Sequence, residues 1–296
     1  MEVGRMPPFI IMGMHRSGTS MVVQLLERLG LFTGVRKQRN HEAMFFLNIN
    51  EWLLRQSCAA WDNPGPFRYL LESEAIGALA VDYIRSISET PAAASFLGLT
   101  RYLRYRSLFR LDFPWGWKDP RNTYTLPIWL RLFPDAKVIH VYRNGVDVAN
   151  SLVVRHCRGF RHKESRYRAV KALYWLRPKR GGFTDSIRCS TLEGAFSLWE
   201  EYMAEARRHV RALGPRAIEL KYEDFVLDPH ESLMRLAGFC GLESGAAGIQ
   251  DVPGLVRRDR AYAYRGDARL LAFAGKVGDR LAVHGYGDVT GAVQDG

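Results

Sequence analysis

The feature that most constrains the fold is a glycine-containing segment near the start of the chain, MGMHRSGTSM at residues 12–21. An apolar run at residues 9–12 precedes it, and apolar residues at helical spacing follow it. This order predicts a strand, an anion-binding loop and a helix. Gly13 and Gly18 have the glycine spacing of G-x-x-x-x-G-K-[ST], but Thr19 stands where that motif has its lysine.

The rest of the chain alternates between strand-like and helix-like patterns. Strands are predicted over a short segment that ends at Lys118 and at residues 137–142 and 217–222. Helices are predicted at about 44–56, after a loop that follows Lys118 and up to about residue 133, from 145, at 192–213 and from 229. Strands that alternate with helices indicate an α/β fold with a parallel β-sheet flanked by helices on both faces. The pattern after about residue 250 is weak, and we expect an irregular segment over residues 250–296.

Composition sets the protein class. With 296 residues and 47% hydrophobic content, a single domain spanning residues 1–296 is expected. No apolar run reaches the length of a membrane helix, and no signal-like segment opens the chain, so we expect a cytoplasmic protein. The four cysteines form no C-x-x-C pair, which argues against a zinc site or a disulfide framework.

The net charge of +11 favours an anionic partner. Residues 155–180 contain ten Lys or Arg residues against the single Glu164, with aromatic residues interleaved. We interpret residues 155–185 as a basic, lid-like segment that attracts an anionic acceptor. A solvated basic loop and an amphipathic helix on a membrane surface remain open alternatives. Residues 244–248 are the best candidate for a local linker.

A second basic position follows the strand at residues 137–142. A nucleoside triphosphatase needs an acidic residue that supports magnesium, commonly at the end of a neighbouring strand, whereas this strand ends in Arg143. The pattern predicts a ligand that brings its own negative charge and a site without metal. A kinase-like P-loop enzyme and a basic nucleic-acid-binding protein remain alternatives.

Four ordered blocks resemble sulfotransferases that use 3′-phosphoadenosine 5′-phosphosulfate (PAPS). MGMHRSGTSMV resembles their 5′-phosphosulfate loop, and VIHVYRNGVDVANSLVVR resembles their 3′-phosphate motif. WKDPR is similar to the lysine-containing strand end of many bacterial members, and LKYEDFVLDPHESLMRLAGFCGL is similar to a later strand and helix. The resemblance covers about residues 9–242 and implies a P-loop-like architecture and sulfuryl transfer from PAPS by metal-independent in-line attack.

The resemblance also implies a set of donor-binding residues. The 5′-phosphosulfate would lie in the glycine loop, Arg143 and Ser151 would bind the 3′-phosphate, and Tyr222 would lie near the adenine. The expected PAPS-binding residues are Arg16, Ser17, Gly18, Thr19, Ser20, Arg143, Ser151 and Tyr222. In several relatives proline replaces Gly145, a difference expected to change the stiffness of the loop.

The catalytic groups follow from the reaction that the resemblance implies. Arg16 and Lys118 are the candidates for stabilising the departing phosphate, although Lys118 could instead pair with Asp119. Glu42 is the first candidate for the base, His41 the second and Glu51 the third. The acceptor is expected to be a small molecule, a glycan or a lipid, and the oligomeric state stays open. No nucleic acid is expected, and the basic segment suits a peripheral membrane contact.

Overall fold

The computed structural model describes residues 5–176, 182–242 and 258–287. The chain forms two compact units. The first comprises Met1–Arg143 and Tyr202–Ala261, and the second comprises Asn144–Glu201 and Tyr262–Gly296. The long helix α9 (Leu192–Leu213) contributes its first half to the second unit and its second half to the first.

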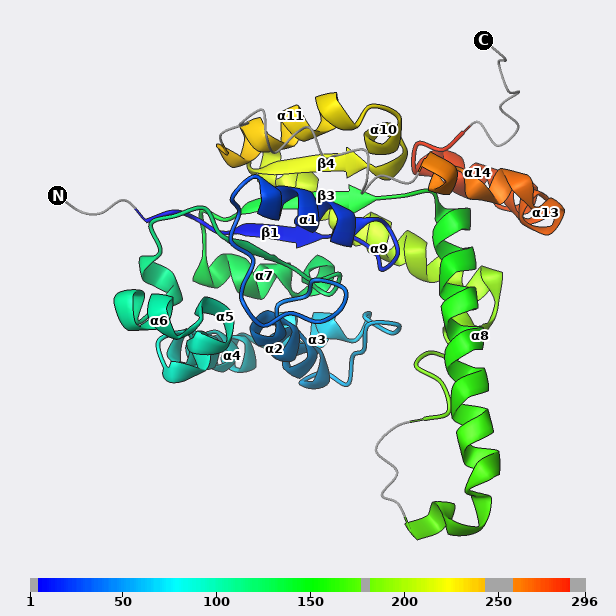
Figure 1. Ribbon diagram of the computed structural model, residues 1–296, viewed down its shortest axis with the longest axis horizontal. Helices are drawn as coiled ribbons and strands as arrows, with labels where there is room; N and C mark the ends of the chain where they lie inside the picture. Colours follow the sequence, from blue (N-terminus) through cyan, green and yellow to red (C-terminus); the bar gives the residue numbers. More distant parts are fainter. Residues whose placement is uncertain (1–4, 177–181, 243–257, 288–296) are drawn as a thin grey trace. The chain divides into compact units, whose positions relative to one another are not determined.

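A four-stranded parallel sheet forms the centre of the first unit (Figure 1). Its strands are β1 (Phe9–Met12), β2 (Gly116–Lys118), β3 (Lys137–Tyr142) and β4 (Ala217–Lys221), in the order β2-β1-β3-β4. In the register, Ile11 lies opposite Lys118 on one side and Ile139 on the other. Because all four strands are parallel, their carboxyl ends meet at one edge, where the segments singled out in the sequence follow β1, β2, β3 and β4.

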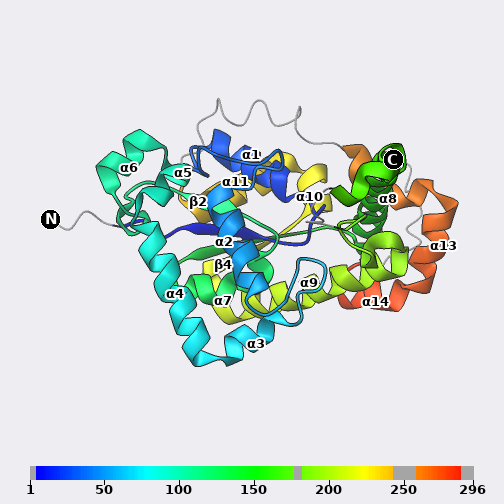
Figure 2. The same ribbon diagram turned by 90° about the horizontal axis from the view of Figure 1, so that it is seen from below.

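Both faces of this sheet are buried under helices, as the sequence predicted. Ile10 and Met12 pack with one apolar cluster, whereas Phe9 and Ile11 pack with another, so the alternation along β1 divides the two cores. The first core includes residues of α2 (Met44–Arg55), α3 (Phe67–Glu72), α4 (Glu74–Ser88) and α7 (Asn122–Leu132). The second includes residues of α1 (Thr19–Arg28) and α11 (Pro229–Cys240) (Figure 2).

The remaining α-helices that the structure describes in the first unit are short. They are α5 (Ala94–Leu97), α6 (Leu99–Tyr105) and α10 (Tyr222–Leu227). The last one differs from the sequence prediction, because Tyr222 begins α10 where the end of a strand and a turn were expected. None of the helices in the described part of the chain combines the length and the apolar character that crossing a bilayer requires.

The second unit is built on α8 (Gly145–Ala169), the first half of α9, α13 (Ala268–Lys276) and α14 (Gly278–Val283). Asn144 caps α8 by accepting a hydrogen bond from the amide of Val146 at 2.9 Å. An added Cβ at Gly145 would lie 2.6 Å from the ring of Trp199 and 2.7 Å from that of Phe196. Close packing against these rings therefore explains why glycine stands at position 145. The sequence alone had related this position to the stiffness of the loop.

Two expectations from the sequence differ from this unit. Residues 268–283 form two helices, so the irregular segment expected after residue 250 is absent from that part of the chain. The first part of the basic segment continues α8 as a helix to Ala169, and Lys171–Leu176 then form a 3₁₀ turn. Residues 177–181 of the basic segment and the predicted linker at 244–248 lie outside the described residues.

Candidate active site

The glycine loop between β1 and α1 has the backbone of an anion-binding turn. Gly13, Arg16 and Gly18 have positive φ angles of 134°, 73° and 90°. An added Cβ at Gly13 would overlap the carbonyl oxygen of Val141 on the neighbouring strand, so only glycine allows β1 to turn here. Gly18 is the N-cap of α1, and the first turn of that helix contains no acidic residue. Its first amides therefore suit an anion.

The loop side chains have different environments. Ser17 is completely buried, and its Oγ has no hydrogen-bond partner among the described residues. Arg16 is exposed, whereas Thr19 is buried at the first position of α1. A buried hydroxyl without a protein partner is unusual and is expected where a ligand completes the hydrogen bonding.

Tyr222 joins the loop to the end of β3. An added Cβ at Gly18 would overlap the Tyr222 ring, so the glycine lets the ring approach the loop. The guanidinium of Arg143 lies 5.0 Å from the centroid of the same ring, a cation–π contact. Burial raises the pKa of the Tyr222 hydroxyl against the opposing effect of Arg143. Nη2 of Arg143 also donates to the carbonyl of Arg260 at 2.5 Å. The glycine loop and Arg143 therefore both contact the ring of Tyr222.

Lys118 and Glu42 form a buried ion pair at the same edge of the sheet. Nζ of Lys118 lies 2.9 Å from Oε1 of Glu42, and their side chains are 1% and 6% exposed. Nζ also donates to the carbonyl of Asn40 at 2.6 Å and lies 3.4 Å from Oγ of Ser20. The Ser20 hydroxyl donates to that same carbonyl at 2.8 Å. The partner of Lys118 is therefore Glu42 rather than the Asp119 considered from the sequence.

The other base candidates lie in different networks. Nδ1 of His41 lies 3.6 Å from Glu27, and Glu51 accepts from Arg121 at 3.0 Å. Of the three candidates, the described contacts place only Glu42 beside Lys118. Ser151 lies on α8 in the second unit, whereas Arg143 ends the first segment of the first unit.

A buried polar network supports the turn after β2 and was missed from the sequence. The side-chain nitrogen Nδ2 of Asn50 donates to Oδ2 of Asp119 at 3.0 Å and to Oδ1 of Asn122 at 2.9 Å. All three side chains are fully buried. Nδ2 of Asn122 in turn donates to the carbonyl of Ile11 at 3.0 Å. The network therefore ties the residues after Lys118 to β1. A polar residue inside the apolar helix pattern FFLNINEW was the available signal.

The sequence matches a family model described as the sulfotransferase family over residues 7–245. A comparison with curated proteins finds no match. The match spans the glycine loop, the Lys118–Glu42 pair and Arg143, and it selects sulfuryl transfer over the kinase-like and nucleic-acid-binding alternatives.

Solved structures give overall similarities at low identity. A sulfotransferase from Alicyclobacillus acidocaldarius is 18% identical with a TM-score of 0.46, covering 94% of this chain and 95% of its own. The sulfotransferase domain of the Synechococcus PCC 7002 olefin synthase is 18% identical with a TM-score of 0.44, covering 87% of this chain and 80% of its own. The assignment rests on the family model, which matches most of the sequence: the chain belongs to the sulfotransferase family and is an enzyme of sulfuryl transfer.

Proposed function

We propose that PAPS is the sulfuryl donor and that the acceptor is a hydroxyl or an amine of a small molecule, a glycan or a lipid. The observation that carries the proposal is the contact chain from Gly18 through the Tyr222 ring to Arg143. It brings an anion-binding loop and a buried arginine to the same edge of one sheet. A donor with phosphates at both ends of one nucleoside would use both groups.

The glycine loop fits the 5′-phosphosulfate end of such a donor. The uncapped amides at the start of α1, the buried Ser17 hydroxyl and the positive φ of Arg16 favour an oxyanion at this turn. Thr19 and Ser20 add hydroxyls to the first turn of the helix. When bound, PAPS supplies a sulfuryl group on a phosphate that leaves readily.

Arg143 fits the 3′-phosphate because its guanidinium is a planar donor held against an aromatic ring. Tyr222 is assigned to the adenine from the sequence resemblance alone. Ser151 is assigned to the 3′-phosphate from the sequence motif alone. We also propose that residues 1–296 act as a single sulfotransferase domain.

Glu42 and Lys118 fit two steps of the reaction, removal of the acceptor proton and stabilisation of the charge on the departing phosphate. Glu42 would take the proton of the acceptor, and the ammonium of Lys118 would hold the departing phosphate oxygen together with Arg16. The 2.9 Å contact lets a charge change on one group be compensated by the other. Fixed cations and helix amides would supply the stabilisation that a divalent ion gives in P-loop kinases, so transfer should continue in the presence of a chelator.

The test is transfer of sulfur-labelled PAPS to pools of candidate acceptors, with EDTA present. The wild type should form labelled product, and Glu42→Gln should lower the rate about 100-fold or more. Glu51→Gln, on the next helix, is the matched control and should keep the wild-type rate. Loss of transfer in Glu51→Gln with normal transfer in Glu42→Gln would refute the base assignment. A strict requirement for Mg²⁺ would refute the proposed mechanism.

A further inference from the structure

We propose that the C-terminal end of α8, with the turn that follows it, binds the surface of an anionic lipid bilayer. We call residues 155–176 the basic tip. It belongs to the second unit and lies outside the groups assigned to sulfuryl transfer. Figure 1 shows α8 as one long helix with this turn at its far end.

Large apolar side chains are exposed together on the turn of the basic tip. Leu173, Trp175 and Leu176 are 62%, 75% and 58% exposed within four residues. Leucine and tryptophan at such exposure are costly in water unless a partner covers them. Tryptophan also favours the boundary between water and lipid, because its indole is largely apolar but carries a polar N–H.

Positive charge surrounds these apolar residues. Residues 155–176 hold seven Lys or Arg residues against the single Glu164. Two of the basic side chains form ion pairs, Arg168 with Glu164 at 2.6 Å and Lys163 with Asp185 at 2.6 Å. Arg158, Arg161, Arg166 and Lys171 are exposed and, within the part of the chain that the structure describes, have no ion-pair partner.

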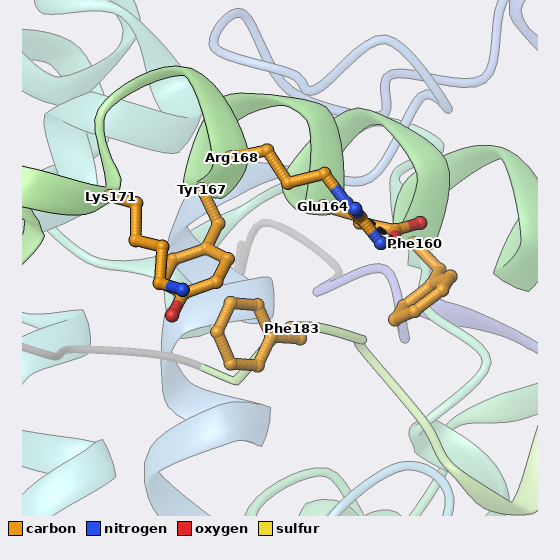
Figure 3. A pocket seen from close by; sticks show the side chains of 6 residues that line it. All are labelled: Phe160, Glu164, Tyr167, Arg168, Lys171 and Phe183. Carbon is orange, nitrogen blue, oxygen red and sulfur yellow. Dashed lines mark hydrogen bonds and ion pairs between the residues drawn. The ribbon is translucent and has the colours of Figure 1, made fainter.

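A pocket of about 500 Å³ between the basic tip and Phe183 is lined by charged and aromatic side chains (Figure 3). Its lining residues are Phe160, Glu164, Tyr167, Arg168, Lys171 and Phe183. The Phe183 ring packs on Tyr167 at 5.2 Å and on Tyr174 at 6.1 Å between centroids. These ring contacts fix the returning chain against α8, so the exposed turn is presented on a packed base.

The combination favours a bilayer over a nucleic acid. Phosphate groups of either partner would attract the arginines. The exposed leucines at positions 173 and 176, however, have no aromatic face for base stacking, whereas the acyl region below lipid headgroups covers such side chains favourably. Apolar residues at the turn with a basic surround are typical of elements that lie in the membrane interface.

The test uses the full chain with vesicles of phosphatidylcholine alone and of phosphatidylcholine mixed with phosphatidylglycerol. Co-sedimentation should show binding to the mixed vesicles and at least about tenfold weaker binding to the neutral ones. The triple variant Leu173→Ser, Trp175→Ser, Leu176→Ser should lose binding at least about tenfold. Reversing charge with Arg158→Glu, Arg161→Glu and Arg166→Glu should do the same.

The matched control is Leu79→Ser, Leu99→Ser, Val283→Ser, which removes side chains that are 70%, 67% and 75% exposed elsewhere. This variant should bind like the wild type. Sulfuryl transfer to a soluble acceptor should be unchanged in the Leu173, Trp175 and Leu176 variant, which separates this inference from the proposed function. Equal binding of wild type and that variant would overturn it. So would binding of single-stranded RNA that the variant retains while vesicles are not bound.

Discussion

Lys118 is central to the proposed chemistry, because its ammonium would stabilise the departing phosphate oxygen. Its ammonium lies within 3.4 Å of three oxygens, from Glu42, Asn40 and Ser20, in a site that is almost closed to solvent. A buried charge is tolerated only where such partners replace water. These oxygens therefore hold the lysine in place, and the lysine in turn holds the carboxylate of Glu42.

Replacing Lys118 with methionine should lower the rate of sulfuryl transfer about 100- to 1,000-fold, because a fixed positive donor at the departing oxygen is lost. Steady-state rates with saturating acceptor measure this effect. The double variant with Glu42→Gln should be little slower than either single variant, since the two groups act as one unit. Lys137→Met is the control, because Lys137 lies at the start of β3, whereas Lys118 lies at the carboxyl end of β2. Fully additive losses would contradict the paired role.

At the scale of helices and strands, α8 contains one glycine at which a larger side chain would clash, Gly145, and one at which it would not, Gly159. Gly145 faces the rings of Trp199 and Phe196, whereas an added Cβ at Gly159 would meet no atom within 4 Å. The two positions therefore provide a matched pair in one helix.

Gly145→Ala should lower the free energy of unfolding by about 1–3 kcal/mol through overpacking. Gly159→Ala should instead raise it by about 0.5–1 kcal/mol, because glycine in a helix interior is unfavourable. Denaturant titration of both variants measures the difference. Equal effects of the two substitutions would show that the contact with Trp199 and Phe196 does not limit this position.

The second half of α9 contains a pH-dependent element. Burial alone would raise the pKa of Glu205, but hydrogen bonds from His209 and Arg208 lower it to about 2 from an ordinary value of 4.5. A carboxyl with a lowered pKa in the folded state stabilises the protein above its unfolded pKa. This contribution is lost as the pH falls from 4.5 towards 2.

Glu205→Gln should therefore flatten the acid side of the stability curve. Between pH 5 and pH 2 the wild type should lose about 1–2 kcal/mol more than the variant, after allowance for partial exposure of the carboxyl. Thermal unfolding at a series of pH values measures the two slopes. Parallel curves would contradict the role of His209 and Arg208.

Over the whole molecule, the parts that were predictable are those specified by local pattern. The bounds of β1, β3 and α9 agree with the sequence prediction, because each is an apolar or amphipathic segment with a glycine within three residues of its end. The pairing of Glu42 with Lys118 was not predicted, although both were candidates, because the contact joins residues 76 positions apart. The network of Asn50 with Asp119 and Asn122 spans 69 and 72 positions, and its signal in the sequence was Asn50 between the apolar residues of one helix.

Short helices near the end of the chain were missed for a different reason. α13 has nine residues, too few for its period to stand out, although Asp267 caps it by accepting hydrogen bonds from the amides of Arg269 and Leu270. The basic segment was interpreted by charge, and its helical continuation of α8 was not predicted. Charge composition describes a surface but does not specify its secondary structure.

The central claim is that one nucleotide with phosphates at its 5′ and 3′ ends is held by the glycine loop and by Arg143, without a divalent ion. The direct measurement is calorimetric binding of adenosine 3′,5′-bisphosphate and of adenosine 5′-monophosphate in EDTA, to wild type and to Arg143→Ala. The account predicts that the wild type prefers the bisphosphate at least about tenfold and that Arg143→Ala loses this preference while its affinity for the monophosphate is unchanged. Equal affinity of the wild type for both nucleotides, or binding only when Mg²⁺ is added, would contradict it.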